Sequence, residues 1–234
     1  MVDRTGGVID ASGCGLLHSP GPTSWRVPRL AAPLELLTPR LRLRQWQASD
    51  QAPFAAMNAD PLVMRYFAGP LGPEASAASI QGWQQAFAER GWSNWALSLH
   101  DTGEFIGFTG LSLPRRTFAF SPCVEIGWRL AAAYWGRGYA TEAARAALQC
   151  GFETLALAEI VSFTSLINSP SRAVMRRIGM GNSGEDFEHP ALPEGSPLRR
   201  HCLYRLRRQV WAAGLAAGAL GPGPLTTSGQ LPSG

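Results

Sequence analysis

A glycine-containing segment between a strand and a helix constrains the possible fold of this chain more than any other sequence feature. Gly136 and Gly138 follow an apolar run, Cys123 to Leu130, that predicts a strand, and they precede an alanine-rich helix predicted to end near Gly151. Glycines at such a junction allow backbone N–H groups to turn toward one point, and the helix N-terminus adds partial positive charge. The segment therefore predicts a site for a phosphate or pyrophosphate group. A Gly-x-Gly pair alone is more often a tight turn, so the neighbouring segments decide between a turn and a phosphate site.

The segments after this helix narrow the choice of fold. A second apolar run, Ala158 to Leu166, predicts another strand, and Asn168 follows it. A short helix is then predicted from Ser171 to Ile178, with Gly179 ending it. The order is strand, Gly-x-Gly-x-Ala, helix, strand, Asn, short helix, Gly.

This order resembles the GNAT superfamily of acetyl-CoA-dependent N-acetyltransferases. Within it, the chain is similar to the branch of ribosomal-protein N-terminal acetyltransferases (RimJ/RimL-like). The segments that carry this second resemblance are Leu36–Arg44 with Asp50, Glu125–Trp128 and Trp135–Ala143. The resemblance implies an α+β domain whose mixed, mostly antiparallel central sheet has about six or seven strands flanked by helices. It also implies that two central strands splay apart to hold coenzyme A.

Hydrophobic periodicity predicts the other elements. Leu41 and Leu43 alternate with arginines, which is typical of an edge-like strand with one buried face. Helix starts are predicted at Ser49-Asp50, Asp60-Pro61 and Pro73-Glu74, and Gly91 is predicted to end the last of them. The remaining runs predict a hairpin and a closing strand, over Trp95–Leu99 with Phe105–Leu113 and over Leu198–Leu206.

Length and amino-acid composition limit the possible domain organisation. With 234 residues, 45% of them hydrophobic, the chain has room for one globular core. We expect residues 1–33, rich in glycine and proline, to be a disordered extension, and residues 34–208 to form the N-acetyltransferase domain. Residues 209–234 are expected to be a flexible tail, apolar at first and then rich in glycine and proline. The apolar stretch from Val210 to Leu220 is too short to span a membrane, although it is long enough for one extra helix.

Several functional classes are excluded or disfavoured. All 21 basic residues are arginine, so neither a lysine Schiff base nor a P-loop lysine is available. The four cysteines (Cys14, Cys123, Cys150 and Cys202) lie far apart, which predicts neither a disulfide framework nor a metal site. Without a signal or membrane-spanning pattern, a cytoplasmic enzyme is the natural expectation. We expect a monomer or homodimer.

The resemblance implies which residues hold acetyl-CoA. Backbone N–H groups from Gly136 to Thr141 are expected to bind the pyrophosphate, and Arg137 adds charge. Asn168 matches an asparagine that contacts pantetheine in the family, although asparagine also marks turns. Arg172 and Arg176 share a helical face that suits either the adenosine phosphates or solvent. The expected cofactor-binding residues are Trp128, Leu130, Trp135, Gly136, Arg137, Gly138, Tyr139, Ala140, Thr141, Asn168, Arg172 and Arg176, with Trp135 standing where the family pattern has Arg or Gln.

Glu125 is the first candidate for the general base. It lies on the strand before the glycine segment, and burial there would raise its pKa toward neutrality. The alternative is a surface glutamate paired with Arg129. His189 and His201 are rival bases, because imidazole titrates in the right range.

The residue that protonates the leaving thiolate is less clearly indicated. Many members of the family carry a tyrosine seven residues after the asparagine, where this chain has Met175. Ser171 and Tyr204 are the candidate catalytic hydroxyls, with Tyr139 a further possibility. A thiol has a pKa of about 8.5, so its thiolate leaves without a strong acid. Oxyanion donors are expected among backbone N–H groups of residues 128–130.

These observations predict an N-acetyltransferase in which a bound amine attacks acetyl-CoA directly in a ternary complex. The acceptor is expected to be a protein N-terminal α-amine or a small-molecule amine. A non-catalytic acyl-CoA-binding module is the alternative, because Met175 replaces the usual acid. A nucleic-acid-binding domain is a third class, raised by the net charge of +4 and by Arg199-Arg200, but no recognised motif supports it, and we expect no nucleic-acid partner.

Overall fold

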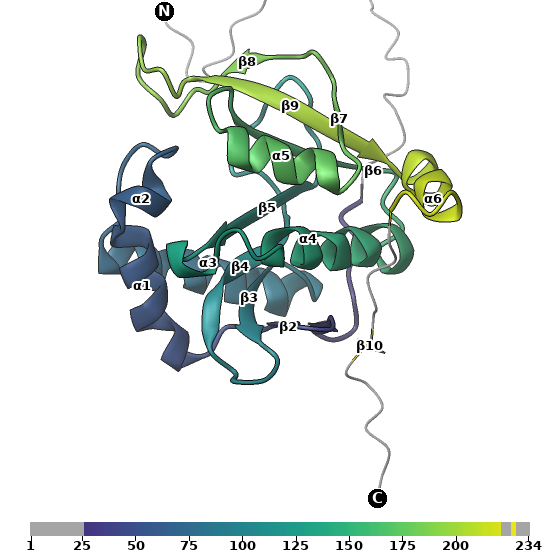
Figure 1. The fold of residues 1–234 in the computed structure, drawn as a ribbon, viewed down its shortest axis with the longest axis horizontal. Helices are drawn as coiled ribbons and strands as arrows, with labels where there is room; N and C mark the ends of the chain where they lie inside the picture. Colours follow the sequence, from purple (N-terminus) through teal and green to yellow (C-terminus); the bar gives the residue numbers. More distant parts are fainter. Residues whose placement is uncertain (1–25, 221–225, 228–234) are drawn as a thin grey trace, which may run out of the picture.

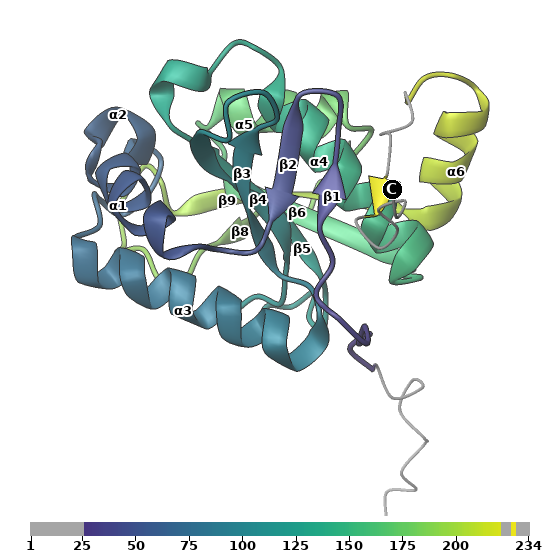
Figure 2. The same ribbon diagram turned by 90° about the horizontal axis from the view of Figure 1, so that it is seen from below.

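A computed structural model describes residues 26–220 and 226–227 of the chain. An open, twisted sheet forms its centre, with α3 (Pro73–Arg90) on one side and α4 (Tyr139–Gln149) on the other (Figures 1 and 2). The strands run in the order β10-β1-β2-β3-β4-β5-β6-β9-β7, and β8 also pairs with β9. The strands are β1 (Leu36–Leu37), β2 (Leu41–Arg44), β3 (Asn94–Leu99), β4 (Phe105–Ser112), β5 (Glu125–Leu130), β6 (Glu159–Ser165), β7 (Gly181–Asn182), β8 (Phe187–Glu188), β9 (Arg200–Arg207) and β10 (Thr226–Thr227).

The helices begin and end close to the predicted boundaries. Asp60 accepts a hydrogen bond from the Leu62 N–H at 2.8 Å at the start of α2, and Gly91, with a φ of +82°, ends α3. The α-helices are α1 (Gln51–Ala59), α2 (Pro61–Met64), α3 (Pro73–Arg90), α4 (Tyr139–Gln149), α5 (Ser169–Arg177) and α6 (Arg208–Ala216). Shorter helical turns are η1 (Ala48–Asp50), η2 (Ala132–Tyr134) and η3 (Cys150–Thr154).

The sheet opens between β5 and β6. This pair is parallel and is matched at a single position, Glu125 with Val161, whereas every other neighbouring pair is antiparallel. The edge of β5 that faces β6 is therefore without a ladder partner from Ile126 onward. The predicted α+β class, the mostly antiparallel sheet and the splay between two central strands are confirmed.

The strand pattern differs from the prediction in two respects. Within the described residues, six strands have four or more residues, and four more have two residues each. Two residues cannot show a period, so the short strands left no signal in the sequence. In addition, β2 is not at an edge, because it pairs with β1 on one side and β3 on the other.

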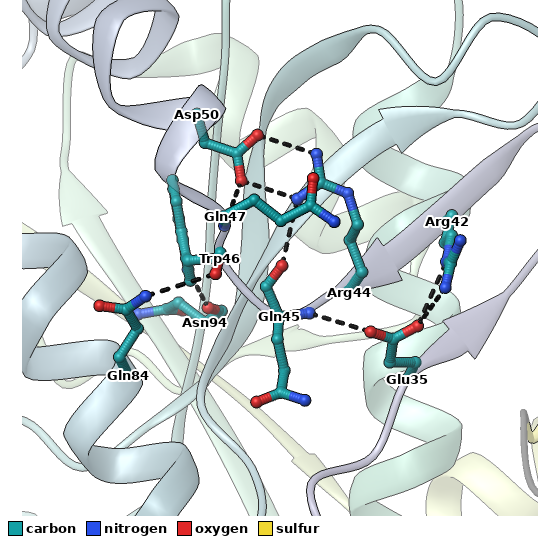
Figure 3. A network of polar contacts seen from close by, with 9 residues as sticks. All are labelled: Glu35, Arg42, Arg44, Gln45, Trp46, Gln47, Asp50, Gln84 and Asn94. Carbon is teal, nitrogen blue, oxygen red and sulfur yellow. Dashed lines mark hydrogen bonds and ion pairs between the residues drawn. The ribbon is translucent and has the colours of Figure 1, made fainter.

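A buried ion pair explains why β2 departs from simple alternation. Arg44, 6% exposed, donates two hydrogen bonds to the Asp50 carboxylate at 2.7 and 2.8 Å (Figure 3). Asp50 also accepts the N–H of Gln47 at 2.8 Å. Trp46, between them, donates from its indole to the Asn94 carbonyl at 2.8 Å. This network ties the end of β2 and the start of α1 to the start of β3.

Segments outside the predicted domain boundaries also pack against the domain. The Leu30 N–H donates to the Arg90 carbonyl at 2.9 Å, and the Trp92 indole donates to the Pro28 carbonyl at 2.8 Å. At the other end α6 places Trp211 5.2 Å from Phe152, between ring centroids. The boundaries at residues 34 and 208 stay predictions, and residues 1–25, with Cys14, lie outside the described part. In that part, no helix combines the length and apolar character needed to cross a membrane.

Candidate active site

A cavity of about 790 Å³ lies where β5 and β6 separate. Its wall includes the glycine segment, the start of α5 and residues of α2 and β6. Most of the predicted site residues line it: Glu125, Trp128, Leu130, Trp135, Gly136, Gly138, Tyr139, Ala140, Thr141, Asn168 and Ser171. Four predicted residues are not part of its lining: Arg137, Arg172, Arg176 and Tyr204.

The glycine segment has the backbone geometry that anion binding needs. Gly136 and Gly138 have φ values of +75° and +81°, in the left-handed region that favours glycine. Gly138 stands immediately before α4, and no side chain of residues 26–220 caps that helix. The first N–H groups of α4 are therefore available at the cavity wall, where the helix dipole favours negative charge.

A cluster that the sequence analysis did not assign holds this segment in place. Arg40 donates to the Arg137 carbonyl at 3.0 Å and pairs with Glu142 at 2.6 Å. Thr38 donates to the same carboxylate at 2.6 Å. The guanidinium of Arg40 also lies 4.7 Å from the ring centre of Tyr139. Arg40 and Glu142 belong to the segments that carried the family resemblance, but the contact between them needs the fold.

The side chain of Trp135 lies at the C-terminal end of β5. Its indole donates to the Leu130 carbonyl at 2.8 Å, and Arg65 from the end of α2 lies 5.5 Å from its ring centre. The side chain remains 38% exposed. The last carbonyl of β5 is thus already satisfied. The Ile126 carbonyl accepts a hydrogen bond from Ser162 Oγ at 2.9 Å, so the part of this edge available to a ligand lies between Ile126 and Leu130.

The side chain of Asn168 is committed to local structure. Its Oδ1 accepts the Ser171 N–H at 3.2 Å, which caps α5, and its Nδ2 donates to Thr164 Oγ1 at 2.9 Å. This geometry matches the turn interpretation. A contact with pantetheine stays a prediction.

The two predicted phosphate-binding arginines of α5 have other partners. Arg172 donates to the Leu166 carbonyl at 2.9 Å, and Arg176 donates to the Tyr204 hydroxyl at 3.5 Å. Both therefore link α5 to neighbouring strands. Arg177, which the sequence analysis did not single out, lines the cavity instead. Helical spacing identified the helix but not which of its arginines faces the site.

Glu125 lies in the cavity wall without a partner. Burial raises the pKa of its carboxyl to about 8, and within the described residues it forms no hydrogen bond or ion pair. Arg129, the partner in the alternative interpretation, instead donates to Asn58 Oδ1 at 2.6 Å and lies 4.1 Å from the ring centre of Phe67. A carboxyl with a pKa near neutrality is suited to proton transfer.

The rival bases lie in a separate cluster. The rings of His189 and His201 are 4.8 Å apart, and burial lowers the pKa of each. Neither lines the cavity. Around them are the rings of Phe118, Phe120, Phe163 and Phe187.

The candidate hydroxyl groups differ in whether their residues line the cavity or are buried elsewhere. Ser171 lines the cavity, as does Tyr139. Tyr204 is 2% exposed on β9 and is not in the lining, so the structure does not bring it to the site. Met175, at the position of the family's tyrosine, is 1% exposed and belongs to the core.

Comparisons with known proteins agree with this geometry. A relative from Bacillus subtilis, "Uncharacterized protein YkkB", is 36% identical over 152 residues, which is 64% of this chain and 86% of the relative. "FsC-acetyl coenzyme A-N(2)-transacetylase" of Aspergillus fumigatus is 31% identical over 163 residues, which is 66% of this chain and 68% of the relative. The crystal structure of an acetyltransferase from Agrobacterium tumefaciens is similar with a TM-score of 0.61 and 30% identity, over 78% of this chain and 99% of that one.

The family model described as "Acetyltransferase (GNAT) domain" matches residues 40–181, which is more than half of the chain. The matched residues include β5, the glycine segment and α5, which together form most of the cavity wall. With its fold, its cavity and this match, the chain belongs to the GNAT family of acetyltransferases and is an acyltransferase.

Proposed function

We propose that this chain transfers the acetyl group of acetyl-CoA to an amine nitrogen by direct attack in a ternary complex. The observation that carries the proposal is the position of Glu125. Its carboxyl, which has no partner within the described part of the chain and a pKa of about 8, lines the same cavity as the glycine segment before α4. The proposed proton acceptor and the proposed anion-binding helix terminus therefore lie in one site.

The donor fits the residues of this cavity. Its volume of about 790 Å³ lies within the range of small-molecule sites. The N–H groups after Gly138 suit a pyrophosphate, and Arg137 and Arg177 add positive charge nearby. The open edge of β5 offers backbone groups for the pantetheine amides. The cofactor-binding residues named above remain part of the proposal.

The reaction balances with the groups present. The amine lone pair attacks the thioester carbon, a C–N bond forms, and Glu125 takes the proton from nitrogen. The oxyanion of the tetrahedral intermediate needs donors, for which backbone N–H groups of β5 are proposed. The C–S bond then breaks and the thiolate leaves, which a thiol pKa of about 8.5 allows without a strong acid. Ser171 is the proposed hydroxyl beside the leaving group, because Tyr204 is buried away from the cavity.

The acceptor is proposed to be a protein N-terminal α-amine or a small-molecule amine. The RimJ/RimL-like segments favour the first, whereas the fungal relative is named for transfer to an N(2) position. An α-amine has a pKa of about 8, so a modest base is sufficient. The cytoplasmic location, the monomer or homodimer state and the absence of a nucleic-acid partner stay predictions.

The test is calorimetric titration of acetyl-CoA, followed by thiol release with N-terminal peptides and small amines. We expect binding, turnover with an amine, and no acetylated protein when mass spectra are taken with acetyl-CoA alone. Binding without turnover on any amine would favour the non-catalytic acyl-CoA-binding module. An acetyl-enzyme that forms and then reacts with amine would contradict direct attack.

A further inference from the structure

A second cavity of about 410 Å³ lies on the other side of Glu125. Its wall comes from the C-terminal half of α3, the start of β3, the end of β4 and the residues that follow β4. Four residues line both cavities: Trp83, Asn94, Ser112 and Glu125. The proposed base is therefore shared between the donor cavity and this second one.

The second cavity contains buried polar atoms that lack partners. Ser93 Oγ, Asn94 Oδ1 and Arg90 Nε are buried without a hydrogen bond inside the described part of the chain. Ser93 is 0% exposed and Asn94 is 6% exposed. Leaving a buried polar group unsatisfied is costly, and such groups in native structures call for an explanation. A bound polar ligand would supply their partners.

The fold holds Asn94 in this position. The Trp46 indole donates to the Asn94 carbonyl at 2.8 Å, and Gln84 on α3 donates to the Trp46 carbonyl at 3.3 Å (Figure 3). The start of β3 is thereby fixed between α3 and the end of β2. Among the described residues, the side-chain oxygen of Asn94 has no hydrogen-bond partner, although its backbone carbonyl is held by Trp46.

Two arginines of this cavity provide positive charge for an anion, and its lining also includes the carboxyl groups of Glu89 and Glu125. Arg90 and Arg115 line it together with Glu89, whose carboxylate already accepts a hydrogen bond from Gln85 at 2.8 Å. Arg115 forms no ion pair with any described residue. The guanidinium of Arg115 lies over Gly82, the one glycine of α3 in this wall. A Cβ built on Gly82 would lie 3.4 Å from Arg115 Nη2. Guanidinium groups are suited to planar binding of a carboxylate.

We propose that this second cavity binds the carboxylate of a small amine substrate, with Arg90 and Arg115 holding the carboxylate and the amine directed at Glu125. The inference rests on the proposed function, because it assigns the acceptor to one side of the same base. The substrate class is an amine that carries a carboxylate, such as a free amino acid. A peptide with an acidic first residue offers the same chemistry, and the experiment separates these two sources.

The experiment compares acceptors that differ in the carboxylate. Free amino acids, the matching amino-acid amides, and peptides beginning with Asp or Ala are assayed for kcat/KM at saturating acetyl-CoA. We expect the wild type to prefer free acids over amides. Arg115→Gln should lower the acid-to-amide ratio about tenfold to hundredfold, the range for a lost charge-assisted hydrogen bond. Taking the ratio in each protein cancels the different intrinsic reactivities of the acids and amides.

Two further variants control for a general effect. Arg116→Gln removes a neighbouring exposed arginine that does not line the cavity, and it should leave the ratio unchanged. Gly82→Leu fills the space beneath Arg115 while improving helix propensity, so α3 should form. We expect Gly82→Leu to raise KM for the amine and to leave acetyl-CoA binding unchanged.

The outcomes separate this inference from the proposed function. Equal turnover of acids and amides, or a ratio that Arg115→Gln does not alter, overturns the inference while acetyl transfer stands. A preference confined to Asp peptides assigns the cavity to an acidic peptide and overturns the small-amine class. If no amine is acetylated, calorimetric titration of free amino acids decides: binding that Arg115→Gln weakens supports the inference, and absent binding overturns it.

Discussion

The two sides of Glu125 are built differently. On the donor side, the proposed anion site comes from consecutive residues, Trp135 to Thr141, and would rely on backbone N–H groups. On the second-cavity side, the polar groups are side chains from α3, β3 and the residues after β4, including Arg90, Ser93 and Arg115. A backbone site needs suitable φ angles in one short segment, whereas a side-chain site needs several segments to meet. The first kind is therefore readable in a sequence and the second is not.

The largest expected effect concerns the residue that both sides share. Glu125→Gln keeps the shape of the side chain and removes the base, so kcat/KM for amine acetylation should fall about 100- to 10,000-fold. Acetyl-CoA affinity, measured by calorimetry, should stay near the wild-type value. An activity within a few fold of wild type would show that another group accepts the proton.

The raised pKa of Glu125 also predicts how pH acts. The unprotonated carboxyl is the base, so activity should rise with pH up to about 8. Stability should move the opposite way, because a folded-state pKa raised from 4.5 to about 8 gives a contribution that is complete below 4.5 and lost as pH rises through 8. Between pH 5 and 8, the wild type should lose about 2–4 kcal/mol of unfolding free energy relative to Glu125→Gln in urea titrations. Parallel curves for the two proteins would contradict this assignment.

The next effect concerns the network that positions the second cavity. Asp50→Ala leaves Arg44 buried without its partner, and we expect the unfolding free energy to fall by about 3–5 kcal/mol. Glu35→Ala breaks a pair 2.8 Å long with Arg42, which lies on β2 like Arg44 but has a side chain that is 50% exposed. That control should lose about 1 kcal/mol or less. Equal losses of unfolding free energy in urea titrations would show that burial does not make the Arg44–Asp50 pair more stabilising than the Arg42–Glu35 pair.

The smallest effect tests the donor side. Gly138→Ala forces a non-glycine residue to a φ of +81°, and its Cβ would meet Arg40 only at 3.5 Å, an ordinary contact. We expect the backbone strain of about 1–2 kcal/mol to lower acetyl-CoA affinity about tenfold. Gly103→Ala is the matched control, because Gly103 has a φ of +71°, open space around it and a place in the β3–β4 turn. Gly103→Ala should lower the unfolding free energy about as much as Gly138→Ala does, and it should leave acetyl-CoA binding unchanged. Equal acetyl-CoA affinities in the two variants would therefore contradict a role for the glycine segment.

The sequence was a good guide wherever a residue acts on its own neighbours. Asp60 as a helix cap, Gly91 as a helix end and the hairpin around Gly103 all follow from local chemistry, and the structure contains each of them. Side-chain partners were harder to predict. Arg176 donates to Tyr204 and Arg129 donates to Asn58, because those contacts join segments that spacing cannot bring together.

The sequence by itself determined the order of elements, the glycine segment before α4 and the candidate base on β5. These depend on φ angles, caps and hydrophobic period, which act over a few residues. The tertiary structure alone decided that Glu125 has no partner among the described residues, that desolvation raises the pKa of its carboxyl, and that Ser93 and Asn94 line a second cavity beside it. The physical reason is that solvation is a property of the surroundings, and the residues that surround Glu125 come from elements far apart in the chain.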